Sequence, residues 1–227
     1  HYRRLMKLDP VSIEEAARYM GVRGVPDEAV CGLLIRADEM VRNSLSPKYV
    51  YRETSVDITE SGVKLGCMNV TLTGKDIASH LSGCTKAVLL AATLSSEADK
   101  LIRQYSVRDM AFSLALDCVC SAAVEQVCEK AEEEIFSAID APYRTWRFSP
   151  GYGDLPLELQ SDVLTALNAQ RRIGLTVTEN SLLIPSKSVT AVIGISDLPL
   201  RKGGSGCGVC NMKDRCAFRK SGRSCRG

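Results

Sequence analysis

The sequence predicts an α+β protein in which helices flank a twisted, mostly antiparallel sheet. Two runs rich in β-branched and aromatic residues, 49–58 and 63–72, flank a turn and predict a hairpin. A continuous apolar run over 85–94 indicates a buried strand. Apolar residues recur with helical spacing over 108–138, which predicts the longest helix.

The N-terminal segment is expected to hold two helices before the hairpin. Ser12 stands before two acidic residues, a pattern typical of a helix N-terminus, so a short helix should run to Gly21. A second helix is expected to begin near Pro26, because proline suits the first turn. Its apolar residues recur on one side, which predicts a face that packs on a core.

After the hairpin the predicted helices and strands alternate. A helix is expected between Thr73 and Gly83, and Ser95 is expected to cap the helix that follows the buried strand. The remaining predicted elements are the long helix 108–138, a Pro/Gly-rich loop at 143–156, a helix ending near Arg172, and strands at 175–184 and 189–195.

Composition indicates a globular protein. The 227 residues include 29 Lys and Arg against 27 Asp and Glu, with 45% hydrophobic residues, which excludes disordered and fibrous classes. A membrane span needs about 20 consecutive apolar residues, and no run here approaches that length. The first residues, 1–7, lack the apolar core of a signal peptide, so we expect a cytoplasmic protein without a membrane segment.

Residues 201–227 differ from the rest of the chain in charge. They carry eight basic residues and one acidic residue, whereas residues 1–200 are acidic overall. We therefore expect a domain over 1–200 and a basic tail over 201–227. Four cysteines in this tail can hold a tetrahedral zinc ion or an iron–sulfur cluster, and the spacing leaves both open: Cys207, Cys210, Cys216 and Cys225. The six scattered cysteines are expected to be small buried apolar residues.

The long helix carries one acidic residue in an unusual place. A stripe at spacings of four and three residues includes Leu114, Cys118, Ser121, Glu125 and Cys128. Glu125 is thus expected among small inward-facing side chains, where a carboxylate needs a partner. An internal arginine, partial exposure to solvent, or the ammonium or sulfonium of a ligand would each serve.

The loop over 147–154 concentrates residues suited to ligand binding. Pro150 and Gly151 favour a tight turn, and glycine lets a ligand approach the backbone closely. Arg147 can pair with a carboxylate through two N–H groups, while Tyr152 offers a hydroxyl and a stacking face. An ordinary connection between a helix and a strand would explain the same composition.

Three motifs occur in order over about fifty residues. Arg147-Phe-Ser-Pro-Gly-Tyr152 is followed by Gly174-Leu-Thr-Val-Thr-Glu179 and by Pro185-Ser-Lys-Ser-Val189. Together they resemble the S-adenosylmethionine-binding activation domain of cobalamin-dependent methionine synthase, with its R-x-x-P-G-Y, G-x-x-L-T-E and P-x-x-S-V-S-G motifs. The family's W-x-P-F-F stretch is absent, and Gly153-Asp154-Leu155 replaces its cysteine- and histidine-bearing continuation after G-Y.

The resemblance implies a set of binding residues for S-adenosylmethionine and no catalytic acid or base. Arg147 would hold the ligand carboxylate, the backbone around Ser149 and Gly151 would bind its polar edge, and Tyr152 and Glu125 would complete a groove between loop and long helix. The implied reaction is reductive methylation, in which cobalamin in the inactive Co(II) state gains one electron and accepts the methyl group of S-adenosylmethionine. Proximity and orientation are the main requirements.

Cobalamin is expected on a separate corrinoid-bearing methionine synthase. His80-Leu-Ser-Gly83 resembles part of the corrinoid-binding signature D-x-H-x-x-G, but Ala78 replaces its aspartate, so a surface or helix-end histidine is expected. A flavodoxin- or ferredoxin-like electron donor could dock on the basic tail.

Two other functions are compatible with the sequence. The chain could activate a different corrinoid methyltransferase, or it could be a non-enzymatic protein whose zinc-ribbon-like tail binds nucleic acid. The second is disfavoured because Phe218 is the one aromatic residue of the tail and the body is acidic, so stacking and phosphate attraction are both weak.

Overall fold

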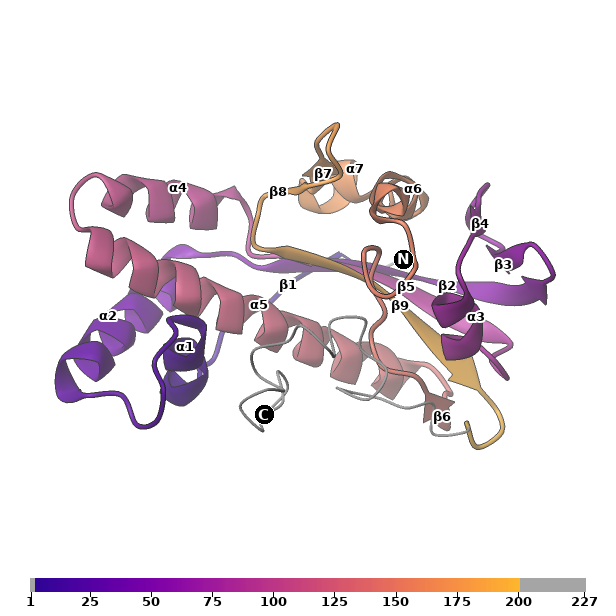
Figure 1. Ribbon diagram of the computed structural model, residues 1–227, viewed down its shortest axis with the longest axis horizontal. Coiled ribbons are helices and arrows are strands. Elements are labelled where there is room, and N and C mark those ends of the chain that lie inside the picture. The colour runs from indigo at the N-terminus through magenta and orange to yellow at the C-terminus, as the bar shows by residue number, and fades with distance from the viewer. Residues whose placement is uncertain (1–2, 201–227) are drawn as a thin grey trace. The chain divides into compact units, whose positions relative to one another are not determined.

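The structure is a computed structural model that describes residues 3–200 (Figure 1). The four tail cysteines predicted to bind metal therefore lie outside the described residues. The helices are α1 (Ile13–Tyr19), α2 (Glu28–Ser44), α3 (Lys75–His80), α4 (Ser96–Ser106), α5 (Met110–Ala138), α6 (Gln160–Leu167) and α7 (Ala169–Ile173), with a 3-10 turn at Leu157–Leu159.

The strands form one large sheet and one small hairpin, which confirms the predicted α+β class. The sheet has the order β4-β3-β2-β5-β9-β6, with β1 paired to β2, and the pairs β1–β2, β2–β3, β3–β4 and β6–β9 are antiparallel. The strands are β1 (Arg3–Leu5), β2 (Lys48–Thr59), β3 (Gly62–Leu65), β4 (Thr71–Leu72), β5 (Lys86–Thr93), β6 (Tyr143–Arg144), β7 (Thr176–Val177), β8 (Leu183–Ile184) and β9 (Ser188–Ser196).

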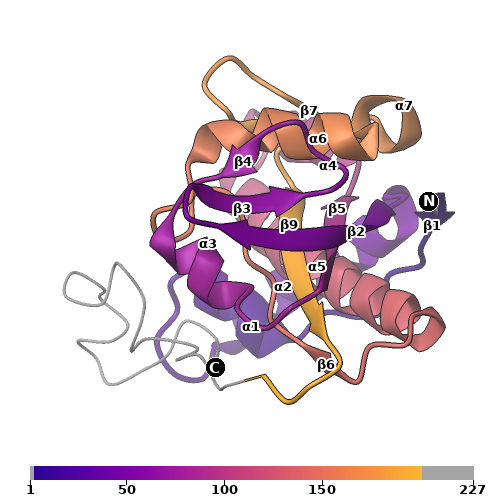
Figure 2. The ribbon, with the colours of Figure 1, turned by 90° about the vertical axis from the view of Figure 1, so that its right-hand side faces the viewer.

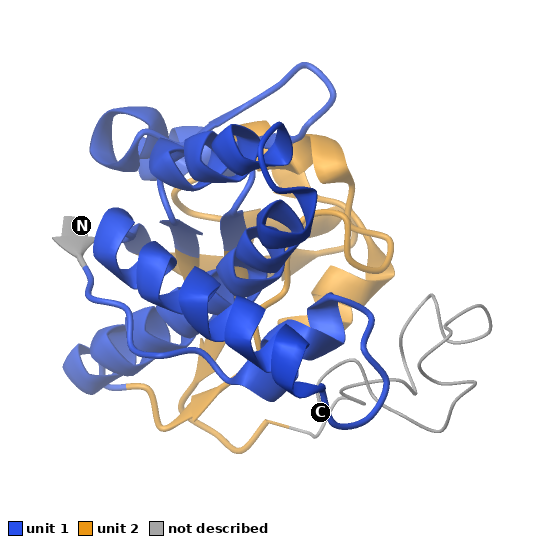
Figure 3. Ribbon diagram, turned by 90° about the vertical axis from the view of Figure 1, so that its left-hand side faces the viewer, with its two compact units in different colours: residues 1–52, 90–140, 163–190 blue, residues 53–89, 141–162, 191–227 orange. Residues whose placement is uncertain are grey.

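The chain divides into two compact units, each assembled from three separate segments (Figure 3). Unit 1 contains residues 1–52, 90–140 and 163–190, and unit 2 contains residues 53–89, 141–162 and 191–227. The strands β2, β5 and β9 each contribute residues to both units. Residues distant in sequence therefore meet within each unit.

In unit 1 the long helix α5 is the packing partner of α1, α2 and α4, which lie alongside it in Figure 1. Asp109 begins the helix by accepting a hydrogen bond from the Phe112 backbone N–H at 3.0 Å. Phe112 is fully buried, with the Tyr105 ring at its edge and the Arg36 guanidinium over its face, 4.3 Å from the ring centroid. The helix α5 is therefore a core element of unit 1.

By length and composition α5 would also be able to cross a bilayer. However, 67% of its most apolar window is buried inside the structure, as expected of a helix at the centre of a folded core. Its apolar side chains pack against α1, α2 and α4, which explains why the helix is apolar.

In unit 2 the predicted hairpin is confirmed, but its second arm is short (Figure 2). The strands β2 and β3 pair Asp57 with Lys64 across a turn at Gly62, whose φ of 133° favours glycine. A Cβ at Gly62 would also lie within 2.4 Å of the Leu72 carbonyl oxygen. The chain leaves the sheet at Gly66–Val70, so the strand expected over 63–72 is interrupted.

Several other expectations need correction. The helix expected to end near Arg172 is broken at Asn168, whose φ is 52°, and the strand expected over 175–184 is instead the hairpin of β7 and β8. Ser95 stands at the N-cap position of α4 as expected, but its side chain makes no capping hydrogen bond, and its hydroxyl donates to the Ser46 carbonyl oxygen at 2.6 Å. Leu114 is 50% exposed and thus does not face inward as its stripe on α5 predicted.

Two leucines of α5, two residues apart in sequence, test this burial pattern. We expect Leu116→Ala, at a fully buried position, to lower the free energy of unfolding by about 2–5 kcal/mol. Leu114→Ala removes the same atoms from a half-exposed position and should cost about 1 kcal/mol or less. Urea denaturation of both variants measures the difference, and equal costs would contradict the exposed placement of Leu114.

Candidate functional site

The loop that carries the R-x-x-P-G-Y motif lies in unit 2 and is held by its own backbone. Phe148 pairs with Val192 of β9 through two N–H···O bonds of 3.0 and 2.8 Å. The Tyr152 N–H donates to the Ser149 carbonyl at 3.0 Å, and the Gly151 N–H donates to the Leu155 carbonyl at 2.9 Å. The predicted tight turn is therefore confirmed.

Glycine is required at the apex of this turn. Gly151 has a φ of 89°, a conformation that other residues adopt only at a cost. A Cβ there would also meet the Leu157 side chain at 3.1 Å. Gly151 is exposed, and since its N–H donates to Leu155, its carbonyl oxygen is the polar group that a ligand can approach without passing a side chain.

The loop is anchored to the N-terminus of α3 by Asp154, a residue that sequence reasoning did not single out. One oxygen of its carboxylate accepts from the Lys75 backbone N–H at 2.7 Å, and the other accepts from the Asp76 N–H at 3.1 Å. Gly74, which precedes α3, has no side chain to make these bonds. The missing cap at Gly74 is the sequence signal that a distant residue was needed.

Aromatic rings gather behind the loop. The His80 ring lies 4.8 Å from the rings of both Trp146 and Phe148, and Tyr152 lies 6.2 and 6.1 Å from those same two rings, all between centroids. The Thr145 hydroxyl lies 2.8 Å from His80 Nε2 and accepts from the Gly194 backbone N–H at 2.8 Å. The C-terminal residue of α3 is therefore packed into the loop.

His80 is neutral at physiological pH. Burial among the rings lowers its pKa from 6.5 to about 4, and a hydrogen bond with the Trp146 backbone opposes this shift only in part. The expectation of a surface or helix-end histidine is confirmed in its second form, because His80 is the last residue of α3 and its side chain is half-buried.

The structure brings four of the five predicted binding residues together in the loop of unit 2. Arg147 is half-buried, with its Nη1 atom buried, and Ser149 is also half-buried. Gly151 is exposed and the Tyr152 side chain is 53% exposed, so backbone and phenol face solvent. Glu125 is half-buried on α5 in unit 1, and its place in the same binding site stays a prediction.

In unit 1 the third family motif is tied to α5 by Lys187. Its ammonium lies 2.9 Å from Asp117 Oδ1 and donates to Ser121 Oγ at 2.9 Å, and its side chain is only 14% exposed. Asp117, Ser121 and Glu125 follow at intervals of four residues, which sets them on one stripe of α5. The connection from β8 to β9 is therefore fastened beside the stripe that carries Glu125.

The same connection has two further anchors in unit 1. The Ser186 backbone N–H and hydroxyl both donate to the carboxylate of Asp99 on α4, at 3.0 and 2.5 Å. The Ser188 hydroxyl donates to Thr93 Oγ1 at 2.7 Å. The conformation of this family motif is thus set by side chains from three neighbouring elements.

The scattered cysteines are mostly buried thiols, as expected. Burial raises the pKa of Cys120 to about 12, and it also raises the pKa of Cys118 and of Cys84. Cys31 and Cys67 are the half-buried exceptions. Within residues 3–200 no group of three His, Cys, Asp or Glu side chains is placed to hold a metal ion.

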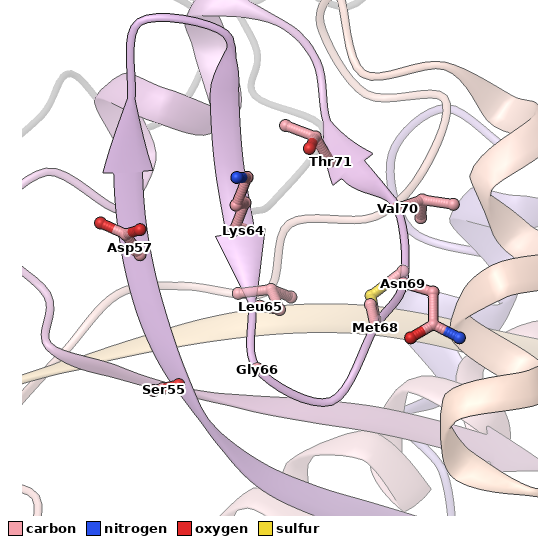
Figure 4. Close-up of a pocket in the computed structure, with 9 residues that line it drawn as sticks. All are labelled: Ser55, Asp57, Lys64, Leu65, Gly66, Met68, Asn69, Val70 and Thr71. Atoms are coloured by element: carbon pink, nitrogen blue, oxygen red, sulfur yellow. The ribbon is translucent and has the colours of Figure 1, made fainter.

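A surface hollow of about 320 Å³ lies on the hairpin of unit 2 (Figure 4). Asp57 and Lys64, which stand opposite each other on β2 and β3, contribute its charged groups. None of the predicted site residues lines it. Its lining is Ser55, Asp57, Lys64, Leu65, Gly66, Met68, Asn69, Val70 and Thr71.

Comparison with known proteins supports the resemblance seen in the sequence. Residues 88–197 match the family model described as "Vitamin B12 dependent methionine synthase, activation domain". A solved structure described as "Crystal Structure of the MetH Reactivation Domain bound to AdoHcy" is similar, with a TM-score of 0.64 and 16% identity over 98% of this chain and 86% of that chain. No curated protein matches the chain by sequence. The predicted fold is therefore confirmed, and the resemblance is borne out over residues 88–197.

The low pKa of His80 predicts a specific loss of stability in acid. Between pH 6.5 and about 4 the unfolded chain binds a proton at His80 that the folded chain does not, so stability falls as pH falls through this window. The loss should reach about 3 kcal/mol at its acid end. We expect His80→Gln to lose less stability than the wild type between pH 7 and 4.5 in thermal unfolding; equal losses would contradict this assignment.

Proposed function

We propose that this chain, which matches the activation domain of vitamin B12-dependent methionine synthase over residues 88–197, binds S-adenosylmethionine and supports reductive methylation of the cobalamin on a separate methionine synthase. The observation that carries the proposal is the R-x-x-P-G-Y loop, which lies inside the matched segment and is a tight turn with exposed backbone at Gly151. The similar solved structure is described as bound to AdoHcy, the product left when S-adenosylmethionine gives up its methyl group.

Each residue of the loop has a task in this proposal. The half-buried Arg147 guanidinium pairs with the ligand carboxylate, an interaction that is stronger away from water. The backbone at Ser149 and Gly151 binds the polar edge of the ligand, because Gly151 has no side chain in the way. The exposed ring of Tyr152 covers an apolar part of it.

Glu125 of unit 1 is the negatively charged residue of the proposed set. Its carboxylate would attract the sulfonium or ammonium group of the ligand. The stripe of α5 that carries Glu125 also holds the pair of Asp117 with Lys187.

Cobalamin in its reduced state supplies the nucleophile, and in this proposal it comes on the partner protein. The sequence has Ala78 where the corrinoid-binding signature D-x-H-x-x-G has its aspartate. The part of this chain is therefore to hold and orient the methyl donor, which is the main requirement when nucleophile and leaving group are both good. A flavodoxin- or ferredoxin-like protein would deliver the electron.

Calorimetric titration of S-adenosylmethionine into the purified chain tests the proposal. We expect Arg147→Ala to weaken binding by about 1.5–3 kcal/mol, the contribution of a hydrogen bond to a charged group. Arg171→Ala, which removes an exposed arginine on α7, is the matched control and should leave affinity unchanged. Wild-type affinity in the Arg147 variant would remove this residue from the site.

The partner assignment predicts that the isolated chain retains no cobalamin. After incubation with cobalamin and gel filtration, the visible spectrum of the protein fraction should lack corrinoid absorption. Methylation should then require a corrinoid-bearing methionine synthase, and activity with only a different corrinoid methyltransferase would change the partner. Tight cobalamin retention by this chain alone would contradict the assignment.

The cysteines of the tail carry a separate proposal, based on their spacing in the sequence. We expect Cys207, Cys210, Cys216 and Cys225 to bind one iron–sulfur cluster or one zinc ion, with a cluster favoured because activation consumes an electron. Anaerobic purification followed by metal analysis decides between them. Cys210→Ser should lose the metal and the control Cys67→Ser should keep it, whereas metal-free wild-type protein with intact thiols would contradict the site.

A further inference from the structure

We propose that Asp154 is a positioning residue for S-adenosylmethionine binding. Its carboxylate accepts two hydrogen bonds from the backbone of Lys75 and Asp76, a contact called the clasp below, and so keeps the loop in its binding conformation. The inference rests on the proposed function, since it assigns the loop a ligand. Asp154 lies outside the R-x-x-P-G-Y motif, and the residues around it are those in which this chain departs from the family pattern.

The first argument is the geometry of the clasp. The two carboxylate oxygens of Asp154 accept from successive backbone N–H groups, those of Lys75 and Asp76, at 2.7 and 3.1 Å. These donors are among the first N–H groups of α3, which have no partner inside the helix. A carboxylate at this end is also favoured by the helix dipole. The bond is thus a helix cap supplied from 79 residues away.

The second argument is that both chain segments carry glycine where they meet. Gly74, with a φ of 134°, would bring a Cβ within 2.5 Å of Asp154 Oδ1. Gly153, with a φ of 56°, would bring a Cβ into the Asp76 carboxylate. Side chains at either position would therefore push the two segments apart. The segments Thr73-Gly-Lys-Asp76 and Gly151-Tyr-Gly-Asp154 thus each carry a glycine where their two backbones come close together.

The third argument is that α3 contacts the loop at its other end as well. His80, its last residue, packs on Trp146 and Phe148 and lies 2.8 Å from the Thr145 hydroxyl. The loop residues from Arg147 to Gly151 therefore lie between two attachments to the same short helix. Releasing Asp154 would free one end of this segment and leave the other end packed.

A loop with one end released spends part of its time in conformations that do not bind ligand. The apparent dissociation constant then rises by the inverse of the fraction that is competent. Asp154 would act through the loop, because both of its carboxylate oxygens accept hydrogen bonds from the backbone of Lys75 and Asp76. Its removal should therefore weaken all ligands of the loop by the same factor.

The chain carries its own reporter for this loop. Trp146 is the one tryptophan in the sequence, and it lies in the loop between the rings of His80 and Tyr152. Quenching of its fluorescence by acrylamide measures how well the loop covers it, with or without ligand. Affinity for S-adenosylmethionine and for its demethylated product is measured in parallel by calorimetry.

Three variants distinguish positioning from a general loss of stability. Asp154→Ala removes both hydrogen bonds of the clasp, and Asp154→Asn keeps one oxygen and remains a good helix cap. Asp197→Asn removes an exposed carboxylate of unit 2 away from the clasp and is the control. All measurements are made well below the unfolding temperature of each variant, so that the folded chain is compared.

We expect Asp154→Ala to raise the dissociation constants of both ligands about tenfold, the effect of losing a helix cap. Trp146 should become more accessible to acrylamide in this variant. Asp154→Asn should restore affinity to within about threefold of the wild type, because asparagine caps helices nearly as well as aspartate. The control should match the wild type in both measurements.

The contrary outcomes are separable. Unchanged affinity in Asp154→Ala with altered Trp146 quenching would show that the clasp is only structural and would overturn the positioning role. If Asp154→Ala changes neither the Trp146 quenching nor the affinity, the inference that Asp154 holds the loop on α3 would be wrong. If the wild type binds neither ligand, the proposed function fails and the positioning role fails with it, while the quenching of Asp154→Ala still decides whether the clasp holds the loop.

Discussion

The helix α5 buries side chains along almost its whole length, and the arrangement of unit 1 depends on this burial. The apolar side chains of α1, α2 and α4 have α5 as their common partner. Moving large buried apolar side chains out of water contributes about 1.5–3 kcal/mol each, so the rotation of α5 about its axis is strongly specified. The half-buried stripe of Asp117, Ser121 and Glu125 is oriented as a consequence.

Unit 2 relies on backbone geometry more than on apolar burial to shape its loop. Three glycines with positive φ, at 74, 151 and 153, let the chain turn and approach itself closely. Backbone hydrogen bonds to Val192 and Leu155 and the carboxylate of Asp154 then hold the result. Such a loop is ordered before a ligand arrives, so less conformational entropy is lost on binding.

A buried helical core in unit 1 and a loop held by its backbone in unit 2 suit the proposed chemistry. Methyl transfer from a sulfonium to a reduced cobalt centre needs a donor that is held and oriented, and it needs no acid or base from the protein. The loop accordingly offers backbone, one arginine and one phenol. The half-buried His80 packs α3 against the loop, and burial raises the pKa of the Cys118 and Cys120 thiols of α5.

The sequence by itself determined the local features of this protein. Ser12 begins its helix as its side chain predicts, the apolar run at 85–94 is a buried strand, and the R-x-x-P-G-Y motif is a tight turn. Each of these depends on hydrogen bonds or periodicity within a few residues. The resemblance of residues 88–197 to the activation-domain family model was also readable from motifs in the sequence.

Tertiary structure alone decided which distant groups meet. Asp154 caps α3 from 79 residues away, and Lys187 pairs with Asp117 across 70 positions of sequence, so neither contact leaves a periodic signal. The exposure of Leu114 and the burial of His80 were also decided by neighbouring elements. The physical reason is that helix ends are capped, and apolar surface is covered, by whichever side chains the folded chain brings near. Local sequence patterns do not indicate which side chains those are.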